Sequence, residues 1–128
     1  MIKIDSQTDK RLIVKGTLNN KDAYMLIDTG ATAGLIDKAI VKKYGLLINK
    51  NHTVNLVGAG GKFTAYTCNT PFAIGGKQIY QFLIADIDAV ADSIERQTGI
   101  RIQGLISLPQ AKMAQMEIDT DDNLISIG

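Results

Sequence analysis

The amino-acid sequence predicts an all-β dominated fold with two or three short helices. Its 128 residues suffice for one domain with one hydrophobic core, and its 45% hydrophobic and 21% charged residues are typical of a globular protein. The 12 glycines outnumber the 2 prolines and separate short apolar segments of strand length. Because no linker, repeat or low-complexity tract interrupts the chain, we expect residues 1–128 to form a single domain.

The first half of the chain is expected to contain strands joined by tight turns and one short helix. The polar turn at 19–22 joins the first two strands, because asparagine accepts the left-handed backbone of a hairpin turn. Helical spacing of apolar residues predicts a helix at 37–44, which Gly45 would end. The predicted strands cover residues 12–18, 23–27, 53–57 and 63–67.

In the second half, the period of the apolar residues changes from that of strands to that of a helix. Apolar residues at i, i+3, i+4 and i+7 predict a helix at 87–97. We expect Asp86 or Asp88 to be its N-cap and Gly99 to end it. The other predicted elements are strands at 71–74, 78–84 and 100–103, a helix within 105–115 whose start Pro109 restricts, and a hairpin of strands 116–119 and 123–127.

Composition excludes several classes of function. The net charge is +1, with 14 basic and 13 acidic residues, and no basic stripe interleaves with aromatic residues, so nucleic acid is a poor partner. No segment approaches the ~20 apolar residues of a membrane span, and residues 1–10 are too polar for a signal peptide. The only cysteine, Cys68, cannot form an internal disulfide, which favours a reducing, cytoplasmic location.

The most informative segment is an apolar strand that ends on an acid. Residues 24–27 form a short apolar run that delivers Asp28 directly from the core, followed by Thr29, Gly30 and the small pair Ala31-Thr32. Ionised carboxyl groups are almost never fully buried unless paired, whereas two that meet can carry out acid/base hydrolysis. Thr29 can bond nearby backbone, and Gly30 permits a close backbone approach. The simpler alternative is an ordinary turn that Asp28 caps.

Other candidate sites have weaker support. His52 is the only histidine and has no spaced partner for a nucleophilic triad, and Cys68 is expected to pack as a small apolar side chain. The acidic segment 119–123 lacks the glycine and the final glutamate of a calcium loop, so it predicts a hairpin turn. The glycines at 58–61 lack the spacing of a phosphate-binding loop. We therefore expect no metal and no cofactor.

The segment Leu-Ile-Asp-Thr-Gly-Ala-Thr at 26–32 resembles the active-site loop of the retropepsin-like aspartic peptidases, the single-lobed relatives of pepsin. The glycine-rich tip at 58–61 is similar to the flap of that family, and Ile-Gln-Gly at 102–104 to the strand that braces its catalytic loop, although Gln103 is polar where an aliphatic residue is usual. The resemblance covers roughly residues 10–127, and the helix at 87–97 is more like bacterial members. It implies a closed β-barrel lobe.

The resemblance also implies a function and an assembly. Asp28 would be catalytic, the loop residues Thr29, Gly30, Ala31 and Thr32 would support it, and Gly58, Ala59, Gly60 and Gly61 would form the flap over an extended peptide substrate. One chain holds one such acid, so an aspartic endopeptidase would require a homodimer with one Asp28 from each subunit. Two alternatives stay open: an inert dimerisation or peptide-binding module of the same fold, and a monomeric structural domain whose acid loop is only a turn.

Overall fold

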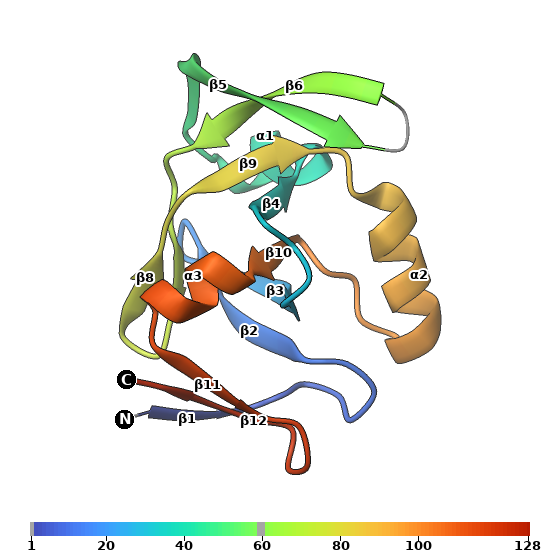
Figure 1. Ribbon diagram of the computed structural model, residues 1–128, viewed down its shortest axis with the longest axis vertical. Helices are drawn as coiled ribbons and strands as arrows, with labels where there is room; N and C mark the ends of the chain where they lie inside the picture. Colours follow the sequence, from blue (N-terminus) through green and yellow to red (C-terminus); the bar gives the residue numbers. More distant parts are fainter. Residues whose placement is uncertain (1, 59–60) are drawn as a thin grey trace.

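The computed structural model describes residues 2–58 and 61–128, which form strands and a few short helices (Figure 1). The helices are η1 (Lys38–Ile40), α1 (Val41–Tyr44), α2 (Asp88–Thr98) and α3 (Leu108–Met113). The strands are β1 (Ile2–Asp5), β2 (Ile13–Leu18), β3 (Lys21–Asp28), β4 (Gly34–Asp37), β5 (Ile48–Gly58), β6 (Gly61–Cys68), β7 (Phe72–Ile74), β8 (Lys77–Ile79), β9 (Phe82–Ala85), β10 (Gly104–Ser107), β11 (Met116–Asp119) and β12 (Leu124–Ile127). The predicted dominance of strands is confirmed.

Most strands belong to one large sheet with the order β5-β6-β9-β4-β10-β3-β2-β7-β8. β10 lies between β3 and β4, parallel to β3 and antiparallel to β4, although some 70 residues separate it from them in sequence. Strand pairs join the sheet from β5 to β8, and no pair between these two end strands is found in the described residues. Closure of the sheet into a barrel therefore stays a prediction.

A second, smaller sheet is formed by the two ends of the chain. Its order is β1-β12-β11, with both neighbours antiparallel to β12, and it lies at the bottom of the view in Figure 1. The hairpin of β11 and β12 confirms the prediction for 116–127. The first residues carry no strand pattern in the sequence, because β1 is short and largely exposed, and it pairs with β12 alone in its sheet.

Two apolar clusters form the core. The larger lies between the two sheets and includes Phe72, Phe82 and Ile125, each fully buried. The smaller lies under α2, where Ile87, Ala91 and Ile94 pack on buried residues of β2, β3 and β10. Val90, the fourth predicted member of this helix face, is 43% exposed, so the buried stripe of α2 is narrower than predicted.

Several local predictions are confirmed by backbone geometry. Asn19 and Asn20 have φ of 51° and 64°, as the predicted hairpin turn between β2 and β3 requires. η1 and α1 together fill the predicted helix at 37–44, and Gly45 ends it with φ of 63°. Gly99 ends α2 in the same conformation. The predicted N-cap is wrong: Ile87 is the N-cap of α2 and makes no side-chain cap hydrogen bond, while the side chain of Asp86 accepts the backbone N–H of Asp88 at 2.9 Å just before the helix.

Several predicted boundaries differ from the structure; the strand expected at 53–57, for example, is β5 and begins at Ile48. The strand expected at 78–84 is two strands, β8 and β9, because Gln81 has φ of 70°, which breaks an extended chain. Residues 100–103 form no strand, and the strand comes afterwards as β10. The helix expected within 105–115 is found as α3, which begins at Leu108 with Pro109 in its first turn, because the preceding residues belong to β10.

None of the helices in the described residues is long and apolar enough to cross a membrane.

Replacing Gly104 by alanine tests the packing of β10. A Cβ at this position would lie 2.3 Å from the carbonyl oxygen of Leu35 and 2.7 Å from the terminal methyl of Met25. We expect Gly104→Ala to lower the free energy of unfolding by about 2 to 3 kcal/mol, measured by urea denaturation. The control is Gly30→Ala, because a Cβ there would meet only Asp28 Oδ1, at 3.4 Å. This variant should lower the free energy of unfolding only slightly. Equal stability of the two variants would contradict this account.

Candidate active site

Asp28 lies at the carboxyl end of β3, where the strand leaves the core. The residues before it, Met25, Leu26 and Ile27, are buried, whereas Asp28 itself is half-buried. β3 is paired on both sides, with β2 and with β10, and Ile27 N–H donates to the carbonyl of Leu12 at 2.9 Å. The strand therefore holds the carboxylate in a fixed place at the surface.

The loop after Asp28 is ordered by hydrogen bonds to Asp28 and to the start of α3. The backbone N–H of Gly30 donates to Asp28 Oδ1 at 3.0 Å, and that of Ala31 to the Asp28 carbonyl at 3.1 Å. Leu108 N–H donates to the Ala31 carbonyl at 3.3 Å. Thr29 is exposed, and in the described residues its hydroxyl has no hydrogen-bond partner. One carboxylate oxygen is thus oriented by the loop.

β10 braces the acid loop from behind. Its last residue, Ser107, is in register with Asp28, so the two strands reach the same edge together. The polar Gln103, which departs from the family pattern, has a clear role just before β10. Tyr24 N–H donates to Gln103 Oε1 at 2.7 Å, and Gln103 N–H donates to the Tyr24 carbonyl at 2.8 Å. The side chain of Gln103 thereby serves as an additional backbone-like partner for β3.

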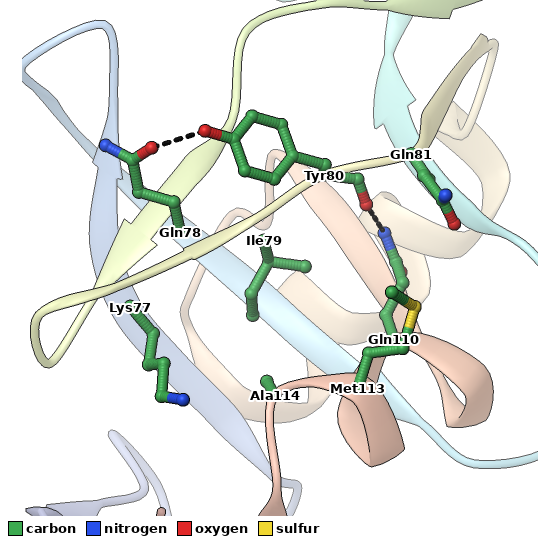
Figure 2. Close-up of a pocket in the computed structure, with 8 residues that line it drawn as sticks. All are labelled: Lys77, Gln78, Ile79, Tyr80, Gln81, Gln110, Met113 and Ala114. Atoms are coloured by element: carbon green, nitrogen blue, oxygen red, sulfur yellow. Dashed lines mark hydrogen bonds between the residues drawn. The ribbon is translucent and has the colours of Figure 1, made fainter.

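Gln110 is a supporting residue that sequence analysis missed. It is 5% exposed, and its Oε1 accepts from the backbone N–H of Ser107 at 2.9 Å and from the Ser107 hydroxyl at 3.2 Å. Its Nε2 donates to the carbonyl of Tyr80 at 2.8 Å (Figure 2). Gly34 must lack a side chain, because a Cβ there would lie 1.9 Å from Gln110 Oε1. The Ser-x-x-Gln spacing of a capping box was the available signal.

Asp28 borders a cavity of about 270 Å³. Its other lining residues are Arg11, Leu12, Leu26, Ile27 and Thr29, so the cavity beside Asp28 is partly apolar and includes one cationic residue. Nothing in the sequence around Arg11 indicated this position. The residue reaches the site because the segment between β1 and β2 is bonded to β3 through Leu12 and Ile27.

A cavity of about 320 Å³ away from Asp28 lies between β8 and α3 (Figure 2). Tyr80 and Met113, both largely exposed, form part of its wall, and Ile79 and Ala114 form apolar lining. It contains no acidic side chain in the described part of the chain. The cavity therefore offers no hydrolytic group of its own.

The predicted flap corresponds to the hairpin of β5 and β6, at the top of Figure 1. Gly58 and Gly61 pair with each other at the ends of these strands. The other two predicted flap residues, Ala59 and Gly60, lie outside the described residues.

The weaker candidates from the sequence do not form a nucleophilic site. His52 and Cys68 line one cavity of about 390 Å³, but the Cys68 thiol contacts the carbonyl of Thr70 at 3.5 Å. Burial raises the pKa of Cys68, which disfavours the reactive thiolate.

Three carboxylates outside the Asp28 loop lie close together, and no sequence pattern predicted this cluster. Oxygens of Asp37, Asp86 and Asp88 are within 4.8 Å of one another. Asp37 accepts from the backbone N–H of Ala39 at 3.1 Å, and Asp86 accepts from that of Asp88. Asp37 and Asp86 therefore have structural roles at the starts of η1 and α2.

The hydrogen bonds of Gln110 give a testable prediction for the support of the site. We expect Gln110→Leu to lower the free energy of unfolding by about 2 to 4 kcal/mol, because Ser107 N–H and the Tyr80 carbonyl lose their buried partner. Lys112→Leu, at an exposed position of the same helix, should change it by less than about 0.5 kcal/mol. Chemical denaturation of both variants measures the difference, and similar losses would contradict the role of Gln110.

Comparison with known proteins places this geometry in a family. The aspartyl protease family model matches residues 14–109. The retroviral protease-like domain of Ddi1 from Leishmania major has a similar structure, with a TM-score of 0.62, 23% identity, and coverage of 91% of this chain and 87% of that one. A retropepsin-like aspartic protease from Rickettsia conorii has a TM-score of 0.61 and 20% identity, with 97% and 86% covered.

A viral enzyme has the same fold. The EIAV protease complexed with the inhibitor HBY-793 has a TM-score of 0.61 and 15% identity, with 91% of this chain and 99% of that chain covered. No curated protein matches the chain at the level of sequence. The structural likenesses establish the retropepsin-like fold, and the family model covers the acid loop, the flap strands and β10. The chain therefore belongs to the aspartyl protease family.

Proposed function

We propose that this protein is an aspartic endopeptidase whose active site forms from two Asp28 carboxylates, one from each of two copies of the chain. The observation that carries the proposal is the position of Asp28. It is half-buried at the end of β3, which pairs with β2 and with β10, its Oδ1 is held by Gly30 N–H, and it is the only acid among the described residues that line its cavity. One chain thus presents half of an acid/base pair.

Two such carboxylates a few Å apart cannot both ionise, so they share one proton. The protonated acid polarises the carbonyl of the scissile peptide bond, while the ionised acid takes a proton from the attacking water. Because the pair titrates as a unit, neither role belongs permanently to one subunit. The amine then leaves with a proton from the pair.

The assembly is an isologous dimer whose two-fold axis passes between the two Asp28 loops. The surface around Asp28 is suited to this contact, since Thr29 and Gly30 are exposed and Leu108, whose N–H bonds the loop, is 36% exposed. In the dimer, Thr29 hydrogen-bonds across the axis, which gives a partner to its hydroxyl. Ala31 and Thr32 keep the loop small.

The substrate is an extended peptide that passes over Gly30 beneath the flap segment 58–61. Main-chain hydrogen bonds hold it, and alternate side chains enter pockets on either side. The domain that performs this reaction comprises residues 1–128. We place it in the cytoplasm, because its single cysteine, Cys68, is free and suits a reducing compartment.

One observation favours the alternative, an inert module of the same fold. β12, the middle strand of the terminal sheet, is paired on both sides within one chain. A second copy can therefore extend this sheet only at the outer edges of β1 or β11. If those edges stay unpaired, the two Asp28 loops are not held together by the chain ends, and Asp28 only caps its own turn.

The proposal is tested by cleavage of a mixed peptide library between about pH 4 and about pH 7, with the mass of the protein in solution measured in parallel. Asp28→Asn should lower kcat/KM at least about a thousandfold, because the amide can neither release nor accept the catalytic proton. Asp22→Asn is the matched control: it removes an exposed carboxylate at the opposite end of the same strand and should keep full activity.

The possible outcomes distinguish the endopeptidase from the inert module and from a monomeric structural domain. Cleavage that survives Asp28→Asn would overturn the mechanism. A protein that stays monomeric and inactive at every concentration would overturn the proposal that it is an enzyme. A dimer that binds peptides without cutting them would favour the inert module.

A further inference from the structure

The segment that precedes β2 is fixed beside the candidate active site. The hydroxyl of Ser6 donates to the carbonyl of Arg11 at 2.8 Å and accepts the backbone N–H of Ile13 at 3.1 Å. The carbonyl of Leu12 accepts from Ile27 N–H, one residue before Asp28. These bonds hold the carbonyl of Arg11 and the two residues that follow it, so the backbone of Arg11 is held beside the end of β3.

Arg11 lines the same cavity as Asp28 and is its only cation among the described residues. Its side chain is exposed, and no ion pair within 4.0 Å involves it in residues 2–58 and 61–128. The neighbouring Lys10 is directed elsewhere, since its Nζ donates to the carbonyl of Gln97 at the end of α2 at 3.2 Å. Arg11 is therefore a positive group available to a ligand in this cavity.

We propose that Arg11 is a specificity-determining residue that binds an acidic side chain of the substrate close to the scissile bond. This inference rests on the proposed function. A guanidinium presents several N–H donors in a planar fork that matches a carboxylate, and it stays charged at any pH at which the enzyme works. The apolar Leu12, Leu26 and Ile27 line the same cavity, and the hydrogen bonds of the guanidinium to a carboxylate are assisted by the two charges.

The alternative partner for Arg11 is a carboxylate of the protein itself. Within one chain, Arg11 and Asp28 are not close enough for an ion pair. A second copy brings its own acid loop toward this surface, but residues 29–36 contain no acidic residue, so that loop supplies no carboxylate besides Asp28. Asp28 is engaged in catalysis in the proposed dimer, so neither acid loop supplies a free carboxylate, and we take the substrate as its source.

The two-fold symmetry of the dimer sharpens the expectation. Each copy contributes one Arg11 beside its own Asp28, so one arginine flanks each side of the scissile bond. A preference for an acidic residue should therefore occur at positions on both sides of the cut, at similar distances from it.

The test uses a peptide that the wild-type protein cleaves and pairs of its derivatives. In each pair, one position within three residues of the cut carries either Glu or Gln, and kcat/KM is measured at about pH 6, where a peptide glutamate is ionised. At one position on each side, the Glu peptide should be cleaved roughly five- to tenfold faster. Added salt should reduce this ratio, because the pair is partly exposed.

Variants assign the preference to Arg11. Arg11→Gln should bring the Glu-to-Gln ratio to about one, Arg11→Lys should keep part of it, and Arg11→Glu should favour a Lys peptide instead. Lys10→Gln removes the adjacent positive charge and should leave the ratio unchanged. A ratio near one for the wild-type protein, or an Arg11→Gln variant that loses activity on both peptides equally, would overturn the proposal.

A binding measurement separates this inference from the proposed function. The same peptides, carrying a fluorophore, are titrated with the Asp28→Asn protein and followed by fluorescence anisotropy. Tighter binding of the Glu peptide that depends on Arg11 supports the inference even if the wild-type protein cleaves nothing. Equal binding of both peptides, or binding of neither, overturns it whatever the cleavage result.

Discussion

The insertion of β10 between β3 and β4 is the interaction on which the rest of the site depends. β10 pairs with both strands and ends in register with Asp28, so it fixes the two strands that carry the acid loop. Gly104 allows the close approach of Leu35 and Met25, and Gln103 supplies an extra hydrogen bond to β3. Because the loop is held at both ends in this way, strand pairing alone fixes the position of its carboxylate. Neither full burial nor an ion pair within the chain is required.

The sequence predicted the features that depend on local chemistry. The acid loop, the turn at 19–22 and the helix ends at Gly45 and Gly99 each follow from the conformational preferences of a few adjacent residues. The position of β10 was predicted wrongly, because a short apolar run is compatible with a strand or with a helix. Only the pairing of this segment with distant strands makes it a strand. Arg11 could not be found, since its position beside Asp28 depends on contacts between distant segments.

In the proposed dimer, each chain supplies only one of the two catalytic carboxylates, and this has a physical consequence. Two carboxylates at contact distance repel unless they share a proton, so the same proton that catalysis needs also permits the two loops to approach. Assembly and activity are then linked through the protonation of the pair. In the proposed dimer, the surfaces available for the rest of the interface are the exposed loop, Leu108 and the outer edges of the terminal sheet.

The most direct test of a shared site is the activity of mixed dimers. Wild-type and Asp28→Asn chains are combined in equal amounts, unfolded in urea and refolded together, and cleavage is compared with that of the same total amount of wild-type protein. If one Asp28 from each copy is required, random pairing leaves about a quarter of the dimers active, and activity falls to about one quarter. Activity of about one half would show that each chain works alone and would contradict the account.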